Sequence, residues 1–287
     1  MNNPSFAHRI IHFPLTKMII GGAALFLSVI VGEFFRSPIL DKTQLTKETK
    51  DVIVAVIEIS LALLSYINIF RFYEKRKIRE LNLGSFWRNA FFGFIMALSI
   101  QSLVILVIFF RANYSIIQVN PPSFLLSGMM EALIAGFIAE IFIRGILFRL
   151  TEEKLGTIIT LIIFGLLFAI LHMGSKGANF LSVFTTTIQA GILVSLLYVY
   201  TRSLWVPIFF HFAWDFAEPT IYGGINPGIH VEKTLFSSSI GGPSLLTGGV
   251  TGPGNSLQAM VFCLLASLVL FYLAKKKKNF IEPFWAK

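Results

Sequence analysis

The chain has 287 residues, of which 55% are hydrophobic and only 14% are charged. A soluble domain of average composition carries about 25% charged residues, so this composition excludes an ordinary soluble enzyme. The formal net charge of +9 would suit nucleic acid, but Lys and Arg lie mainly at the ends of apolar runs. Basic residues at helix ends interact with anionic lipid headgroups and set the topology of a membrane protein. We therefore expect no nucleic-acid partner.

Eight apolar segments have the length that a helix needs to cross ~30 Å of hydrocarbon. They predict an all-α fold, a polytopic transmembrane helical bundle of about eight membrane helices. The first segment ends without the small-residue pattern of a cleavage site, so it is predicted to be a membrane helix and not a signal peptide. The predicted spans are residues 18–35, 52–70, 90–110, 125–149, 157–173, 180–200, 204–222 and 257–274.

Basic residues concentrate in alternate connections between these spans, at 71–88, 149–154, 202 and 275–278. Because Lys and Arg are enriched in cytoplasmic loops, we expect both termini in the cytoplasm. The protein is predicted to be an integral, multi-pass membrane protein, in the cell membrane if prokaryotic and in the endoplasmic reticulum if eukaryotic.

The longest connection, 223–256, is rich in Gly, Ser, Thr and Pro. Irregular backbone cannot lie unpaired in lipid. The segment is therefore expected either to lie in water or to fold back as a lid over a polar cavity in the protein.

Ionisable side chains inside the predicted spans are the informative residues, because each costs at least about 2.5 kcal/mol to insert at the bilayer centre. The fourth span carries Glu140 and Arg144, the fifth ends at His172, and the seventh carries His211 and Asp215. Residues four apart share a helix face, which predicts a Glu140–Arg144 pair and a His211–Asp215 pair. If these side chains turn inward, the bundle holds a buried polar site suited to activating water or holding a metal.

These side chains can meet only if they lie at similar depths in the membrane. At 1.5 Å of rise per residue, Glu140 lies about 15 Å, His211 about 12 Å and His172 about 24 Å from the cytoplasmic helix ends. His172 comes level with the others only if a helix is tilted or broken.

Structural roles and a different function are the alternatives. Glu140 and Arg144 could form an ion pair that fixes packing, and His211 could bond a neighbouring helix with Asp215 orienting it. A proton-coupled transporter would also carry such residues, but it predicts paired broken helices or internal symmetry, which the sequence does not show.

Three segments resemble, in order, the motifs of the CPBP intramembrane proteases, usually written EExxxR, FxxxH and Hxxx(N/D). They are Ala139–Leu147, Phe168–His172 and Ser203–Asp215. That family includes the CAAX prenyl endopeptidases and the bacteriocin-processing or immunity proteins, also called the ABI family. We accordingly divide the one integral membrane domain into N-terminal helices, 1–124, and a CPBP-like core, 125–287.

The resemblance implies an intramembrane endopeptidase, of glutamate or metallo type, that cleaves a membrane-associated peptide or protein. CAAX-type prenylated tails and leader peptides are the expected substrates. In the family, the first Glu acts with the equivalent of His172 to activate water, while His211 and Asp215 would stabilise the oxyanion or orient the site. The resemblance thus implies four catalytic residues, Glu140, His172, His211 and Asp215. Arg144, which would hold Glu140 in place, and Phe168 are the supporting residues.

No cofactor is expected from the resemblance, and zinc is the metal that this residue set could hold. Its ligands would come from Glu140, His172, His211 and Asp215.

One position departs from the family pattern, because the first Glu of EExxxR is Ala139 here. A methyl group cannot accept a proton, and loss of a general base typically costs 10²- to 10⁴-fold in rate. The chain is therefore expected to be inactive or strongly impaired, through an engineered substitution or as a natural member that has lost hydrolysis. A non-catalytic peptide-binding or immunity scaffold of the same fold is the alternative function.

Overall fold

The computed structural model describes residues 13–111, 113–175, 177–225 and 233–286. All eight predicted spans are helical, which confirms the all-α prediction. In chain order the α-helices are α2 (Pro14–Arg36), α3 (Lys47–Asn68), α4 (Phe86–Phe110), α5 (Leu125–Glu140), α6 (Arg149–Met173), α7 (Phe180–Thr186), α8 (Val194–Thr201), α9 (Trp205–Phe216), α10 (Ser244–Thr247) and α11 (Leu257–Lys276).

Six helical stretches among the described residues are long and apolar enough to cross a membrane. One of them, 122–173, contains the predicted fourth and fifth spans, which are separated at Gly156 (φ 78°). Only a residue without Cβ adopts this left-handed backbone readily, so the chain bends there. The predicted seventh span is helical over 205–221, as α9 and the π-helical turn that follows it.

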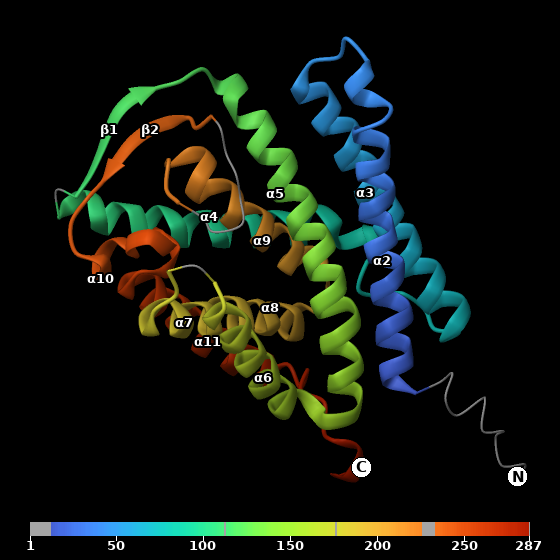
Figure 1. The fold of residues 1–287 in the computed structure, drawn as a ribbon. Coiled ribbons are helices and arrows are strands. Elements are labelled where there is room, and N and C mark those ends of the chain that lie inside the picture. Colours follow the sequence, from blue (N-terminus) through green and yellow to red (C-terminus); the bar gives the residue numbers. More distant parts are fainter. Residues whose placement is uncertain (1–12, 112, 176, 226–232, 287) are drawn as a thin grey trace, which may run out of the picture.

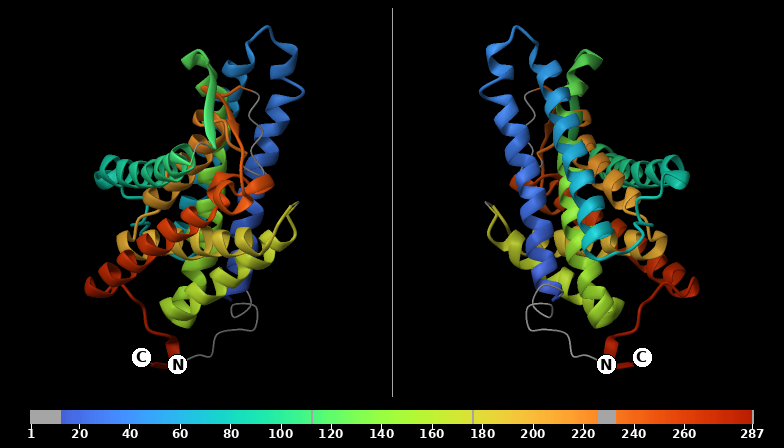
Figure 2. Two further views of the ribbon diagram at one scale, coloured as in Figure 1. Left: turned by 90° about the vertical axis from the view of Figure 1, so that its left-hand side faces the viewer. Right: turned by 90° about the vertical axis from the view of Figure 1, so that its right-hand side faces the viewer.

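The helices are not parallel. Figures 1 and 2 show α2, α3 and α5 upright, with α4 and α8 running across them and α6 and α9 inclined. The first described residues of α2 and the C-terminal segment lie at the same end of the molecule (Figure 1). The cytoplasmic location of both termini stays a prediction.

Helix α9 is packed closely between α4 and α5 because glycines face it. A Cβ at Gly93 of α4 would lie 2.2 Å from the carbonyl oxygen of Val206, and a Cβ at Gly136 of α5 would lie 2.9 Å from that of Ile208. Small residues let membrane helices approach backbone to backbone. This contact brings the side chains of α9 next to the end of α5.

Several helices continue through π-helical turns, over Ile69–Tyr73, Ile141–Phe148, Thr187–Leu193 and Ala217–Ile221. Such turns are uncommon and are often found at functional sites. The last three of these turns carry residues of the cavity described below.

The sequence patterns did not predict a short antiparallel sheet, β1 (Tyr114–Val119) with β2 (Phe236–Ile240). It joins the α4–α5 connection to the Gly-rich 223–256 segment, with Tyr114 opposite Ile240 (Figure 1). The pairing satisfies backbone groups of an otherwise irregular segment and holds it against the helices.

Candidate active site

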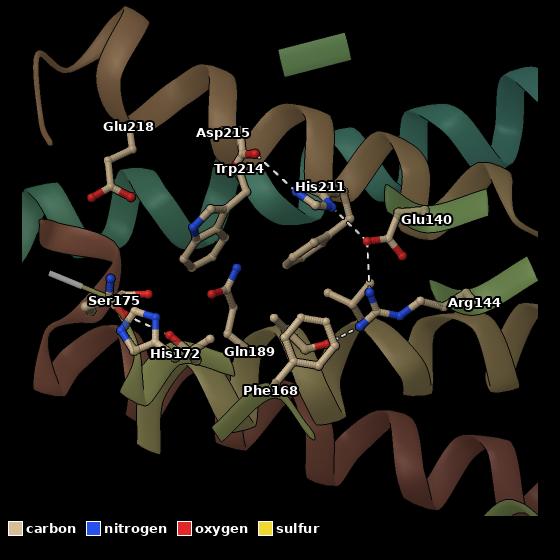
Figure 3. A pocket seen from close by; sticks show the side chains of 15 residues that line it. Glu140, Arg144, Phe168, His172, Ser175, Gln189, His211, Trp214, Asp215 and Glu218 are labelled. Carbon is tan, nitrogen blue, oxygen red and sulfur yellow. Dashed lines mark hydrogen bonds and ion pairs between the residues drawn. The ribbon is translucent and has the colours of Figure 1, made fainter. Parts of the chain in front are cut away.

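A cavity of about 290 Å³ lies among α5, α6, α7 and α9 and the π-helical turns that adjoin them (Figure 3). Its walls combine ionisable, amide and aromatic side chains, as expected of a site that binds and orients a ligand. The lining residues are Glu140, Arg144, Phe168, His172, Ser175, Thr186, Gln189, Ala190, Val194, Phe210, His211, Trp214, Asp215, Glu218 and Asn255.

Glu140 and Arg144 form the predicted ion pair, with Nη1 of Arg144 2.9 Å from Oε1 of Glu140. Both side chains are about 1% exposed. The guanidinium also donates to the carbonyl oxygen of Ala190 and lies 5.1 Å from the centre of the Phe168 ring. Arg144 therefore ties the end of α5 to the 187–193 turn, and Phe168 covers it.

His211 bridges two carboxylates. Its Nδ1 lies 2.7 Å from Oε1 of Glu140 and its Nε2 lies 3.1 Å from Oδ2 of Asp215. A neutral imidazole has one N–H, so making both hydrogen bonds requires a proton on each ring nitrogen or on one carboxyl group. The predicted His211–Asp215 pair is confirmed, and it is extended into a chain from Asp215 through His211 and Glu140 to Arg144.

His172 lines the same cavity, although the residue count placed it deeper than the others. The incline of α6 in Figure 1 supplies the tilted helix that the count required. Its Nε2 is buried and has no hydrogen-bond partner among the described residues. In the view of Figure 3 it lies at the end of the cavity away from Arg144.

Ala139 lies on α5 beside Glu140 and is not one of the residues that line the cavity. The single methyl group offers no hydrogen-bonding atom, so the carboxylates that line the cavity come from Glu140, Asp215 and Glu218.

Glu218 is a lining residue that our sequence reasoning missed. It is buried, its Oε2 accepts from Nε2 of Gln101 at 3.0 Å, and its Oε1 accepts from the backbone N–H of Gly254 at 2.9 Å. No cation among the described residues pairs with it. The signal was present, since Glu218 is an ionisable residue inside the predicted seventh span.

Gln189 was also missed, because its amide is neutral and the sequence analysis considered only ionisable residues within the spans. The 187–193 π-helical turn places it on the cavity wall, between Trp214 and Phe168 in Figure 3.

The Gly-rich segment contributes to the cavity as well. Asn255 lines it and accepts from the hydroxyl of Thr186 at 3.1 Å, while Gly254 donates to Glu218. The segment 223–256 was expected either to lie in water or to fold back over a polar cavity. The contacts of Gly254 and Asn255 favour the second for residues 248–256, which we call the lid.

The arrangement does not suit a metal ion. Across the described ranges, no three His, Cys, Asp or Glu side chains are grouped as metal ligands would be. Both nitrogens of His211 are already hydrogen-bonded to carboxylates, whereas a ligating imidazole needs one free lone pair.

Residues 121–217 match the model of a protein family described as Rce1-like, "Type II CAAX prenyl endopeptidase Rce1-like". This third of the chain is CPBP-like. The comparisons with curated proteins and with solved structures return no match. The CPBP-like segment includes all three motifs and most of the cavity lining. Glu218 lies directly after it, and Asn255 lies further along the chain.

Proposed function

We propose that the chain is an intramembrane endopeptidase of the CPBP type whose cavity receives a peptide segment from the membrane. The observation that carries the proposal is the convergence of all three motifs on one cavity. Glu140, His172 and His211 come from three different helices and line it together. A family match to CAAX prenyl endopeptidases over the same residues supports this reaction class.

In the proposed mechanism, the free Nε2 of His172 holds and deprotonates the attacking water together with a carboxylate at position 139. Because Ala139 does not line the cavity, this carboxylate would have to reach it from the adjacent position of α5 on the longer side chain of Glu. The other residues act on the substrate carbonyl. His211, fixed by Asp215 and Glu140, stabilises the oxyanion or orients the peptide, and preorganised donors of this kind contribute strongly in a water-poor site. Arg144 holds the Glu140 side chain in place through their ion pair, so Glu140 is a positioning residue.

Ala139 leaves this mechanism without its carboxylate. Glu140 does not replace it directly, because its Oε1 already interacts with both Arg144 and His211. We therefore propose that hydrolysis by the chain as it stands is reduced on the order of 10²- to 10⁴-fold relative to a variant with Glu at 139.

The cavity walls favour a membrane-associated substrate. Aromatic surface lies beside the hydrogen-bonded series from Asp215 to Arg144, and it comes from Phe168, Phe210 and Trp214. A prenylated carboxyl-terminal tail or a hydrophobic leader would place its scissile bond against the polar groups and its apolar part against these rings.

A non-catalytic peptide-binding or immunity scaffold is the second candidate, and Ala139 is the observation that favours it. Such a protein would keep the helices, the cavity and the aromatic walls. It would bind the same peptides without cleaving them.

The deciding experiment measures cleavage of prenylated CAAX peptides and hydrophobic leader peptides by the full chain in lipid nanodiscs. The chain as it stands, Ala139→Glu, Ala139→Gln and Ala139→Glu combined with His172→Ala are compared. The Gln variant is the matched control, since it has the size of Glu without its basicity.

Cleavage by the Glu variant alone would support the protease proposal. Peptide binding by all variants without cleavage by any would support the scaffold instead. Cleavage by the Gln variant at the same rate as the Glu variant would contradict the role proposed for position 139.

A further inference from the structure

A second cavity, of about 310 Å³, lies where the chain turns back after α3. It is lined by Ile67, Arg71, Arg76, Lys77, Ile78 and Leu81. The turn follows the 69–73 π-helical segment and passes through Lys75, whose backbone is left-handed (φ 54°). The returning residues 76–81 therefore face the end of the helix they have just left, and the cavity lies between the two.

Arg76 lines this cavity, but Glu74 and Glu80 already neutralise its charge. Its guanidinium nitrogens lie 2.6 and 3.1 Å from the two carboxylate oxygens of Glu80 and 3.0 Å from Oε2 of Glu74. It also lies 5.6 Å from the centre of the Phe70 ring. A side chain held in this way is rigid and offers little further attraction to an anion.

Two other basic residues of the lining remain available. Arg71 and Lys77 are exposed, and within the described part of the chain neither forms an ion pair. The acids nearby are occupied, since Glu74 pairs with Lys17, Arg76 and Arg149, and Glu80 pairs with Arg76. The rim of the cavity therefore carries two uncompensated positive charges.

The position of the cavity along the chain points to the kind of ligand. It lies at the end of the candidate span 47–73, where Glu74 pairs with Lys17 near the beginning of α2. Phe72, beside Arg71, is 69% exposed and adds apolar surface next to the basic rim. Apolar and basic lining residues are combined here, and an amphiphile with a phosphate group would satisfy both.

We propose that this cavity is a binding site for an anionic phospholipid. The phosphate would lie between Arg71 and Lys77, and the glycerol and first methylene groups would lie against Ile67, Ile78 and Leu81. A soluble phosphate ester has the same phosphate group and could bind the same two basic residues. Only a lipid would also contact the apolar residues of the cavity. The site is separate from the candidate active site and does not depend on the proposed function.

The test uses the full chain in a neutral detergent, with lipid retention followed by native mass spectrometry. Dioleoyl phosphatidylglycerol is titrated against dioleoyl phosphatidylcholine, and glycerol 3-phosphate is added as a soluble competitor. The variant is Arg71→Gln with Lys77→Gln. Its matched control is Lys75→Gln with Arg79→Gln, which removes the same charge from exposed residues of the same turn that do not line the cavity.

We expect the unmodified chain to retain phosphatidylglycerol in preference to phosphatidylcholine. Affinity should fall on the order of tenfold or more in the Arg71/Lys77 variant, and about twofold or less in the control. The charge-conserving variant Arg71→Lys with Lys77→Arg should retain the lipid, which separates loss of charge from loss of fold.

Equal losses in the variant and in its control would show general surface attraction and overturn the proposal. So would equal retention of the two lipids. Competition by glycerol 3-phosphate at lipid-like concentrations would assign the site to a soluble phosphate ester instead.

Discussion

The Nδ1 atom of His211 lies 2.7 Å from Oε1 of Glu140, and the same oxygen lies 2.9 Å from Nη1 of Arg144. One carboxylate oxygen thus joins α9 to α5 and to the turn that follows α5. Because Glu140 and Arg144 are buried together, each depends on the other for compensation of its charge.

A double-mutant cycle tests this dependence. We expect Glu140→Gln and Arg144→Gln each to cost about 3 to 5 kcal/mol of unfolding free energy. The first leaves the buried Arg144 charge unpaired, and the second leaves Glu140 with His211 as its remaining partner. The double variant should cost clearly less than the sum. Unfolding in mixed micelles measures these values, with exposed Lys154→Gln as the control. Additive costs would contradict the coupling.

The lid is tested at Gly254. A Cβ there would lie 2.5 Å from Oε2 of Glu218 and 3.2 Å from the Trp214 ring, and Gln101 holds that oxygen in place. We expect Gly254→Ala to cost about 1 to 3 kcal/mol and to loosen the lid, measured by thermal unfolding and by hydrogen exchange at 248–256. Gly241→Ala is the matched control, since a Cβ at Gly241 meets nothing within 4 Å. Equal effects of the two substitutions would contradict a lid held by Glu218.

Acid should destabilise the turn after α3. Burial by itself would raise the pKa of Glu80, but the hydrogen bonds and charge of Arg76 outweigh it, and the pKa lies below its ordinary value of 4.5. A carboxyl group whose pKa is lower in the folded chain stabilises the fold above the unfolded-state pKa and loses this contribution as the pH falls through the folded-state pKa.

We therefore expect the unfolding temperature to be level near neutral pH and to fall below about pH 4.5. Glu80→Gln should lower it at neutral pH and make the acid decline shallower. The measurement is thermal unfolding from pH 3 to 8, with exposed Glu282→Gln as the control. An unchanged acid slope in the Glu80 variant would show that this group is not responsible.

Chelation tests the absence of a metal role. Because both His211 nitrogens are hydrogen-bonded to carboxylates, we expect a zinc chelator to leave peptide cleavage by the Ala139→Glu variant within about twofold. Loss of cleavage that added zinc restores would contradict this expectation and return His172 and His211 to the role of ligands.

Local patterns were sufficient to predict the helical spans and the two i,i+4 pairs. Apolar length decides whether a helix can cross lipid, and residues four apart meet on any helix. Glu140–Arg144 and His211–Asp215 therefore followed from spacing alone, before the position of any neighbouring helix was known.

The tertiary structure decided how these pairs join and what else reaches them. Only the close packing of α9 against Gly136 brings His211 onto Glu140, and only the incline of α6 (Figure 1) brings His172 to the same cavity. The contact of Glu218 with Gly254 of the lid likewise joins two segments that are distant in the sequence. Contacts between distant segments depend on helix tilt, bends and π-helical turns, which a linear count of 1.5 Å per residue does not contain.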